Sequence, residues 1–240
     1  MMEVGAKTVP TLVVDDDPRV RLLVRVNLEA RGYSVQEAAT GGEAIALMQQ
    51  TLPSLIILDL VMPGMGGDEV CSWIRERSDV PVIVLSAHNE EDLKVRALDA
   101  GADDYVTKPF AQEEFMARIR AVMRRVTNPV PKDDGSVINI QGLTINLKAR
   151  RAFVNDRDLR LTRTEFALLA QLAQNLDAIL THDELLARVW GEEYRGSSHY
   201  LHVYFGRIRK KMGEVHSNLL ESVPGIGYVL HADFPSDSSQ

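Results

Sequence analysis

Three consecutive carboxylates follow the first apolar run of the chain. Residues 12–18 read LVVDDDP, so Asp15, Asp16 and Asp17 stand between three apolar residues and a proline. Neighbouring carboxylates repel one another and resist losing water, so an unbalanced cluster costs stability. Either a cation balances the cluster or the run is a solvated turn. Asp17 by itself fits a helix N-cap, because Pro18 is favoured in the first turn of a helix.

Other reactive side chains follow the later apolar runs. Asp59 comes after LIIL, Ser86 after VIVL, and Lys108 just past DYV. In a doubly wound parallel sheet, the carboxyl ends of the strands form the ligand-binding edge, so these groups are expected to converge there. Carboxylates with nearby hydroxyl and ammonium donors suit Mg2+. They also suit a phosphoryl group whose charge is neutralised while one carboxylate attacks phosphorus.

The elements expected to position these groups alternate between strand and helix. Apolar runs occur at residues 11–14, 33–38, 55–60, 80–86 and 104–106, and amphipathic segments lie between them. In the first such segment Val20, Leu23, Val24 and Leu28 follow helical spacing. The alternation predicts an α/β domain of flavodoxin-like, doubly wound type with a five-stranded parallel sheet.

The pattern changes after a short stretch rich in proline and charge. Residues 126–137, VTNPVPKDDGSV, predict a linker between a first domain at 1–125 and a second at 138–240. The second domain begins with short alternating strands, continues with three helical segments at 162–175, 181–191 and 198–213, and closes with a hairpin at 223–230. This order predicts an α+β winged helix-turn-helix domain.

The composition limits the class of protein. A single cysteine, Cys71, excludes an internal disulfide and suits a packing role in a reducing compartment. No apolar run approaches the roughly 20 residues of a membrane span, and no signal peptide is visible, so we expect a cytoplasmic protein without a membrane partner. The net charge is −7, but residues 1–125 hold 14 Lys and Arg against 20 Asp and Glu, whereas the remainder holds 13 against 14. Nucleic-acid binding by the second domain therefore stays open.

A basic helix is expected near the end of the second domain. No acid occurs between Tyr194 and Met212, where five bases lie: Arg195, Arg207, Arg209, Lys210 and Lys211. The helical pattern assigns four residues to the core: Leu201, Phe205, Ile208 and Met212. His199, Val203, Gly206 and Lys210 lie opposite, flanked by Tyr200, His202, Arg207 and Arg209. A glycine inside a helix costs roughly 1 kcal/mol, which indicates close approach of another molecule. The helix fits a DNA major groove; a solvated basic face is the alternative.

The ordered motifs resemble one family. VVDDD, LDLVMPGMGG, VIVLSA and GADDYVTKPF are similar to the receiver domain of two-component response regulators, and LTRTEFALL and GIGY resemble the winged helix of the OmpR/PhoB family. The resemblance implies a non-enzymatic transcriptional regulator. A sensor histidine kinase phosphorylates its receiver, which then dimerises, and the winged helices bind direct-repeat promoter DNA. A regulator of the same fold that acts without phosphorylation is the alternative.

An enzyme of a different class shares part of the acidic pattern. Haloacid-dehalogenase-like phosphatases also use a strand-end aspartate with Mg2+, and Asp15 and Asp17 form their D-x-D spacing. That family would not explain the Lys108–Pro109 pair or a second domain. The response-regulator interpretation therefore explains more of the chain.

The resemblance assigns roles in the acidic pocket residue by residue. It implies that Asp59 is the phosphoacceptor and a Mg2+ ligand, that Asp16 binds Mg2+ directly and Asp15 through water, and that the carbonyl of Val61 completes the metal shell. It implies that Lys108 pairs with the phosphoryl group, Ser86 closes onto it and Tyr105 changes rotamer as the switch. The Lys108–Pro109 bond is expected to be cis. Val61 and His88 would flank the water that hydrolyses the phosphoryl group.

The resemblance also assigns two surfaces. DNA contacts are expected from His199, Tyr200, Val203, Gly206, Arg207, Arg209, Lys210, Lys211 and Ser222. The dimer interface is expected to use Lys94, Asp99, Asp104, Glu114, Arg118 and Arg120. Pro224 stands where relatives often carry a wing arginine, so the helix is expected to read the sequence. Residues 191–198 are placed where this family meets RNA polymerase, or form a plain polar connection. SHYLHVY resembles the branch that regulates potassium-transport operons.

Overall fold

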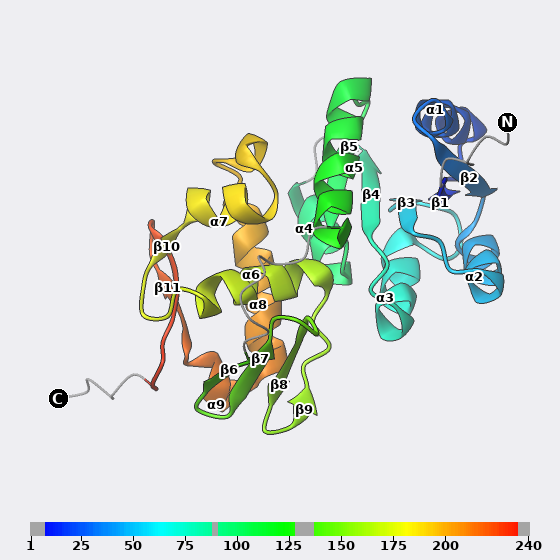
Figure 1. Cartoon of the computed structure of the whole chain (residues 1–240). Helices are drawn as coiled ribbons and strands as arrows, with labels where there is room; N and C mark the ends of the chain where they lie inside the picture. Colours follow the sequence, from blue (N-terminus) through cyan, green and yellow to red (C-terminus); the bar gives the residue numbers. More distant parts are fainter. Residues whose placement is uncertain (1–7, 88–90, 128–136, 235–240) are drawn as a thin grey trace, which may run out of the picture. The chain divides into compact units, whose positions relative to one another are not determined.

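The computed structural model describes residues 8–87, 91–127 and 137–234 (Figure 1). The chain forms two compact units that divide between Met123 and Arg124. The predicted linker, residues 126–137, lies almost wholly outside the described residues, as does His88. Within the part of the chain that is described, no helix combines the length and apolar character needed to cross a membrane.

The first unit is the predicted doubly wound α/β domain with a five-stranded parallel sheet. Its strands are β1 (Val9–Val14), β2 (Tyr33–Ala38), β3 (Leu55–Asp59), β4 (Val82–Ala87) and β5 (Asp104–Lys108), in the order β2-β1-β3-β4-β5. Its helices are α1 (Pro18–Glu29), α2 (Gly41–Gln50), α3 (Gly67–Arg77), α4 (Glu91–Ala100) and α5 (Gln112–Thr127). Each strand is followed by a helix, which is the connection that parallel pairing requires.

The core of this unit lies between the sheet and the helices that cover it. All five residues of β3 are buried, as near-continuous apolar strands predict. Val24 and Leu28 of α1 join Phe115 of α5 in one buried cluster, and full burial of such side chains contributes about 1.5–3 kcal/mol each. Leu23 also follows the helical spacing of α1 but is 51% exposed, so the buried stripe is narrower than the pattern indicated.

The second unit has the predicted winged-helix order of strands, helices and hairpin. Its first sheet is antiparallel, with β6 (Val137–Ile140), β7 (Leu143–Asn146), β8 (Arg151–Val154) and β9 (Arg157–Asp158). The helices are α6 (Arg163–Ala173), α7 (His182–Val189) and α8 (His199–Met212), with short turns η1 (Glu192–Tyr194) and α9 (Glu214–Ser217). The last sheet joins β10 (Leu180–Thr181), β12 (Gly227–Leu230) and β11 (Leu220–Val223) in that order.

A capping box and a buried helix face hold α6 and α8 in this unit. The Thr162 side chain accepts from the Glu165 amide, and Glu165 reaches back to the Thr162 amide, forming a capping box at the start of α6. On α8 the four predicted core residues are all buried: Leu201, Phe205, Ile208 and Met212. Trp190 is also fully buried. The opposite face of α8 is therefore left to other contacts.

The helix after β3 begins against the backbone of β3 itself. A Cβ atom added at Gly67 would lie 2.1 Å from the carbonyl oxygen of Asp59 and 2.8 Å from the Cα of Leu60. Both neighbours are backbone atoms and cannot move aside alone. Glycine at this position therefore sets how closely α3 packs behind the predicted phosphoacceptor.

We expect Gly67→Ala to destabilise the first unit and to displace Asp59, since the added methyl group overlaps main-chain atoms. Gly42→Ala is the matched control, because nothing lies within 4 Å of a Cβ at that helical position. The control should be neutral or stabilising by about 0.5–1 kcal/mol. Hydrogen exchange of the β3 amides measures both effects. Equal protection in the two variants would contradict the close-approach explanation.

Candidate functional site

Three carboxylates meet at the carboxyl edge of the parallel sheet. Ligand oxygens of Asp15, Asp16 and Asp59 all lie within 4.8 Å of one another. The sheet order explains this, because β1 and β3 are hydrogen-bonded neighbours whose carboxyl ends lie side by side. Asp15 is fully buried, Asp59 is 6% exposed, and Asp16 faces solvent. The donor set is all oxygen, which suits a hard divalent cation.

Lys108 bridges two of these carboxylates from the end of β5. Its Nζ lies 2.6 Å from Oδ2 of Asp15 and 2.9 Å from Oδ2 of Asp59. Burial raises the pKa of Asp59 above its ordinary value, although the hydrogen bond from Lys108 opposes this shift. Desolvation lowers the pKa of Lys108, but its hydrogen bonds to Asp15 and Asp59 outweigh that effect and leave it raised. The ammonium thus offsets the repulsion between the two buried carboxylates.

Ser86 and Val61 border the same edge. Ser86 lies near the end of β4 and is 1% exposed, and its Oγ has no hydrogen-bond partner among the described residues. A buried hydroxyl without a partner costs about 1–3 kcal/mol, so its position favours a ligand that supplies an acceptor. The amide of Val61 donates to Oδ1 of Asp59 at 3.4 Å, and the Val61 side chain is 60% exposed.

The loop that carries Asp15 and Asp16 is held by an arginine that sequence reasoning missed. Arg21 donates from one Nη atom to the carbonyl oxygens of Asp15 and Asp16, at 2.6 and 3.2 Å, and pairs with Glu37 of β2. Arg21 lies one turn into α1, a position from which a long side chain can reach back to the loop before the helix. The helix expected after Pro18 could therefore have indicated that Arg21 reaches the loop of Asp15 and Asp16.

Asp17 is the predicted N-cap of α1. Its Oδ1 accepts from the Arg19 amide at 2.8 Å, and its carboxylate also pairs with the Arg19 guanidinium. The hydrogen bonds from Arg19 lower the pKa of Asp17 to about 2. Asp17 thus belongs to the helix rather than to the oxygen cluster, and the opening run of three carboxylates has two separate roles.

The predicted switch and dimer residues lie on β5 and α5. Tyr105 is 7% exposed, and the Arg118 guanidinium lies over its ring at 5.8 Å. Arg118 also pairs within the chain with Asp104 at 3.2 Å and with Glu114 at 3.0 Å. Asp99 and Arg120 are exposed, and the side chain of Lys94 lies outside the described part of the chain. The Lys108–Pro109 peptide is cis, as predicted.

In the second unit, α8 presents the predicted stripe to the surface. His199, Gly206 and Lys210 are exposed, and Val203 is partly exposed. A Cβ added at Gly206 would have nothing within 4 Å, so the surface there is open. The middle of the helix can therefore approach another molecule closely.

The other cations of α8 contact this unit itself. Arg207 lies 2.8 Å and Lys211 2.6 Å from separate oxygens of Glu165, whose carboxylate is fully buried. Arg209 donates twice to the carbonyl oxygen of Leu220, at 3.0 and 2.9 Å. These three side chains fix the orientation of α8 against α6 and the hairpin. Lys210 is the cation on the exposed stripe of the described helix.

The expectation that Tyr200 flanks the accessible stripe is wrong. Tyr200 is 1% exposed, and its ring lies 5.5 Å from that of Trp190 and 5.7 Å from that of Tyr194. The helical wheel placed it at the edge of the stripe, but α7 and η1 supply aromatic partners on that side. Ser222, also predicted to contact DNA, is half-buried on β11 opposite Tyr228 of β12.

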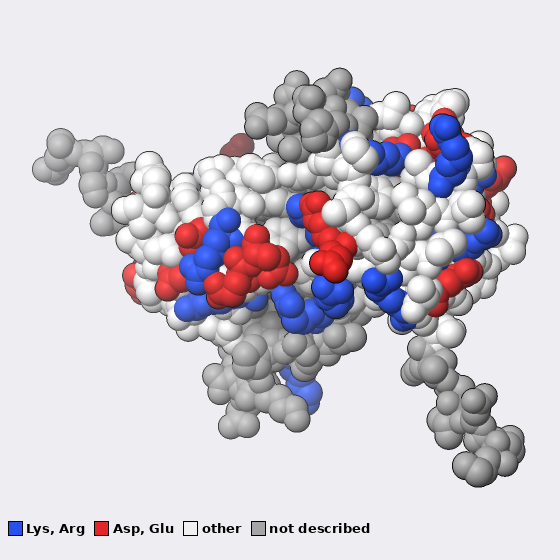
Figure 2. Space-filling view, turned by 90° about the horizontal axis from the view of Figure 1, so that it is seen from above, with Lys and Arg blue, Asp and Glu red and all other residues white. Residues whose placement is uncertain are grey.

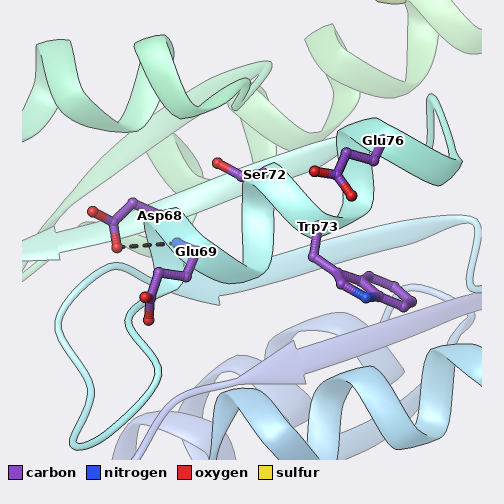
Figure 3. Close-up of a pocket in the computed structure, with 5 residues that line it drawn as sticks. All are labelled: Asp68, Glu69, Ser72, Trp73 and Glu76. Carbon is purple, nitrogen blue, oxygen red and sulfur yellow. Dashed lines mark hydrogen bonds between the residues drawn. The ribbon is translucent and has the colours of Figure 1, made fainter.

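Charge on the face of the molecule seen in Figure 2 is mixed rather than of one sign. On the face in Figure 2, Lys and Arg are interspersed with Asp and Glu, in keeping with the net charge of −7. A hollow of about 360 Å³ lies on α3, away from the oxygen cluster, and is lined by Asp68, Glu69, Ser72, Trp73 and Glu76 (Figure 3). Asp68 pairs with Arg96, and Glu69 caps the start of α3. These carboxylates already have structural partners.

The fold and site define a class of protein, in which an acidic receiver domain is followed by a winged helix. A family model described as "Response regulator receiver domain" matches residues 11–120, and one described as "Transcriptional regulatory protein, C terminal" matches residues 156–230. The chain belongs to the OmpR/PhoB family of two-component response regulators. It is a phosphorylation-activated transcriptional regulator, and its family implies a sensor kinase and DNA as partners.

Similar proteins align with both domains of the chain. "Transcriptional regulatory protein KdpE" of Mycobacterium tuberculosis is 40% identical over 223 residues, covering 92% of this chain and 98% of that protein. "Response regulator MprA" of a Mycobacterium species (strain KMS) is 42% identical over 228 residues, covering 93% and 98%. A solved structure of a RitR mutant superposes with a TM-score of 0.75 at 22% identity, covering 92% of this chain and 98% of that one, and supports the fold.

Removing the ammonium from the site should raise the pKa of Asp59 further. In Lys108→Met the carboxylates of Asp15 and Asp59 lose their shared cation, whereas the control Arg19→Met affects only the pair with Asp17. The folded state would then hold the Asp59 proton more tightly than the unfolded state does. Protonation of Asp59 would therefore stabilise the fold at low pH, and this stabilisation would be lost as the pH rises through the raised pKa of Asp59. Carbon NMR titration of the metal-free carboxyl groups measures the shift. An unchanged Asp59 titration would refute the bridging role.

Proposed function

We propose that Asp59 accepts the phosphoryl group with Mg2+ held beside it by Asp15, Asp16, Asp59 and the Val61 carbonyl. The observation that carries this proposal is the convergence of three carboxylates with the Lys108 ammonium and the hydroxyl of buried Ser86, which has no partner among the described residues. The oxygen-only donor set fits Mg2+, which supplies charge neutralisation for the phosphoryl oxygens. Asp16, the exposed member, is the accessible direct ligand.

In the transfer, the residues of this chain attack, orient and neutralise. An Asp59 carboxylate oxygen forms a bond to phosphorus as the donor's P–N bond to the kinase histidine breaks, and the electron pair of that bond stays on the imidazole nitrogen. Lys108 donates to one phosphoryl oxygen from its position beside Asp59. The Ser86 hydroxyl donates to another and so gains an acceptor. Movement of Ser86 would then draw Tyr105 into its switched rotamer.

The phosphorylated receiver is proposed to form a symmetric dimer through α4, β5 and α5. Asp104, Glu114 and Arg118 already pair within one chain, and in a two-fold arrangement such partners can be exchanged between chains. Lys94, Asp99 and Arg120 are assigned to the same face. Exposed pairs contribute about 0–1 kcal/mol each, so they would set the geometry of the dimer more than its affinity.

The output is proposed to be promoter binding by α8 in the major groove. Support comes from its exposed stripe, with His199, Val203 and Gly206 at the surface and Lys210 beside them. Paired winged helices would bind direct-repeat sites. Residues 191–198, in which Glu192, Glu193 and Arg195 are exposed, are proposed to meet RNA polymerase. This role places the chain in the cytoplasm, where the DNA and the kinase catalytic domain meet.

The phosphoacceptor assignment predicts loss of labelling on a single substitution. Asp59→Asn should abolish aspartyl phosphate formation from acetyl phosphate, because an amide is a poor nucleophile, and wild type should need Mg2+. Asp68→Asn is the control, since Asp68 pairs with Arg96 outside the oxygen cluster. Phosphate-affinity gel electrophoresis with and without Mg2+ measures the product. Labelled Asp59→Asn, or labelling of wild type in excess chelator, would reject the assignment.

The two kinds of cation on α8 should respond differently to truncation. Lys210→Ala should leave stability unchanged and reduce the salt slope of DNA binding by about one unit, as loss of one phosphate contact requires. Arg207→Ala leaves buried Glu165 with Lys211 alone and should cost about 3 kcal/mol of stability. Thermal unfolding and salt-dependent binding to a selected duplex separate the effects. A large stability loss in Lys210→Ala, or none in Arg207→Ala, would reverse the assignment.

A further inference from the structure

His202 occupies a position on α8 between the exposed stripe and the wing hairpin. It is exposed, one turn after His199 and one turn before Gly206. Its Nδ1 lies 2.9 Å from the hydroxyl of Tyr228, which is on β12 and is 1% exposed. A surface imidazole is thus held by a buried phenol from a different element of the winged helix.

Tyr228 lies between the hairpin and α8. Its backbone is paired with Ser222 in the β11–β12 register, and its hydroxyl contacts His202 of α8. Burial raises the pKa of the Tyr228 phenol, so it keeps its proton and can act as a donor. In the ring form that carries its proton on Nε2, Nδ1 of His202 accepts from this phenol. The hairpin and the helix are joined by this hydrogen bond.

The contact determines which nitrogen of His202 faces outward. An imidazole whose Nδ1 accepts a hydrogen bond carries its proton on Nε2 while neutral. Within the described residues, Nε2 of His202 has no hydrogen-bond partner. The ring of His182 lies 5.9 Å from that of His202 and 5.7 Å from that of Tyr228, so the imidazole is also packed on its other side. His202 is therefore a fixed single donor at the helix surface.

We propose that His202 donates a hydrogen bond from Nε2 to an acceptor on DNA, and that Tyr228 is the residue that positions it. This inference rests on the proposed promoter binding by α8 and adds a contact outside the predicted stripe. Residues in the first half of a recognition helix approach base edges, and base and phosphate oxygens and purine nitrogens are all acceptors. Tyr228 acts through His202 and need not touch DNA.

Pro224 is consistent with this arrangement. Pro224 of the wing has no side-chain donor to offer DNA. Through Tyr228, the hairpin instead orients a side chain of the helix. The stacked rings of Tyr228 and Phe205, with centroids 3.9 Å apart, keep the phenol fixed above the core.

The test uses the full chain treated with acetyl phosphate and a duplex selected by wild type from a random library. His202→Ala should weaken binding to that duplex about three- to tenfold, as loss of one hydrogen bond predicts. Tyr228→Phe keeps the ring stacking and should weaken binding less. In the double variant, Tyr228→Phe should add no further loss. His231→Ala is the control, because His231 pairs with Glu221 on the hairpin and not with α8.

Two further measurements identify the DNA acceptor of His202 and test whether Tyr228 fixes the tautomer of its ring. A base-edge acceptor predicts relaxed preference at one base pair, whereas a phosphate acceptor predicts equal loss on all duplexes with an unchanged salt slope, because the donor is neutral. Nitrogen NMR of the His202 ring should show the Nε2–H form in wild type and a mixed tautomer in Tyr228→Phe.

The inference is overturned if His202→Ala binds every duplex as wild type does. It is also overturned if the loss from Tyr228→Phe persists in full when His202 is absent, since Tyr228 would then act by another route. Failure of wild type to select any duplex would refute the proposed function itself, which is a separate outcome.

Discussion

The contact between Lys108 and the buried carboxylates of Asp15 and Asp59 is the interaction on which the first unit depends. A carboxylate held at the end of a buried strand resists ionisation, and a second one beside it resists more strongly. The sheet order makes this crowding unavoidable, because β1 and β3 are neighbours and aspartate stands at the carboxyl end of each. One ammonium, delivered from β5, offsets it at 2.6 and 2.9 Å. Three strands far apart in sequence must therefore keep their register for the site to exist.

The second unit also balances buried charge, but with two cations around one carboxylate instead of one cation between two carboxylates. Here the buried group is a single carboxylate, Glu165, and two cations from α8 converge on it. The carboxylate also caps α6 through the Thr162 amide. A side chain that begins one helix thus fixes the orientation of another, and buried ion pairs with extra hydrogen bonds favour geometric specificity over net stability. The surface of α8 is left with fewer free cations than its sequence contains.

The residues of the acidic site could be predicted because a general rule places them. Strand-end side chains of a parallel sheet converge whatever the details of packing, so Asp15, Asp59 and Lys108 were found from apolar runs alone. The flanks of α8 could not be predicted in this way. Its wheel separates core from surface, but which neighbour covers each flank depends on the positions of α6, α7 and the hairpin. For that reason Tyr200 was misplaced, and the partners of Arg207 were not foreseen.

The same limitation explains why Arg21 was missed and why the contact of His202 with Tyr228 was not foreseen. Each acts through a contact with a segment that its own helical pattern does not contain: the loop before α1 and the strand β12. The first contact holds the carbonyl oxygens of Asp15 and Asp16, and the second holds Nδ1 of an imidazole whose Nε2 faces outward. Transfer of a phosphoryl group to Asp59, as proposed, would replace its carboxylate charge by a charge of roughly −1.5 to −2 beside the ammonium of Lys108. One ammonium would not balance that charge together with the carboxylates of Asp15 and Asp16, so the charges of the site favour an additional cation there.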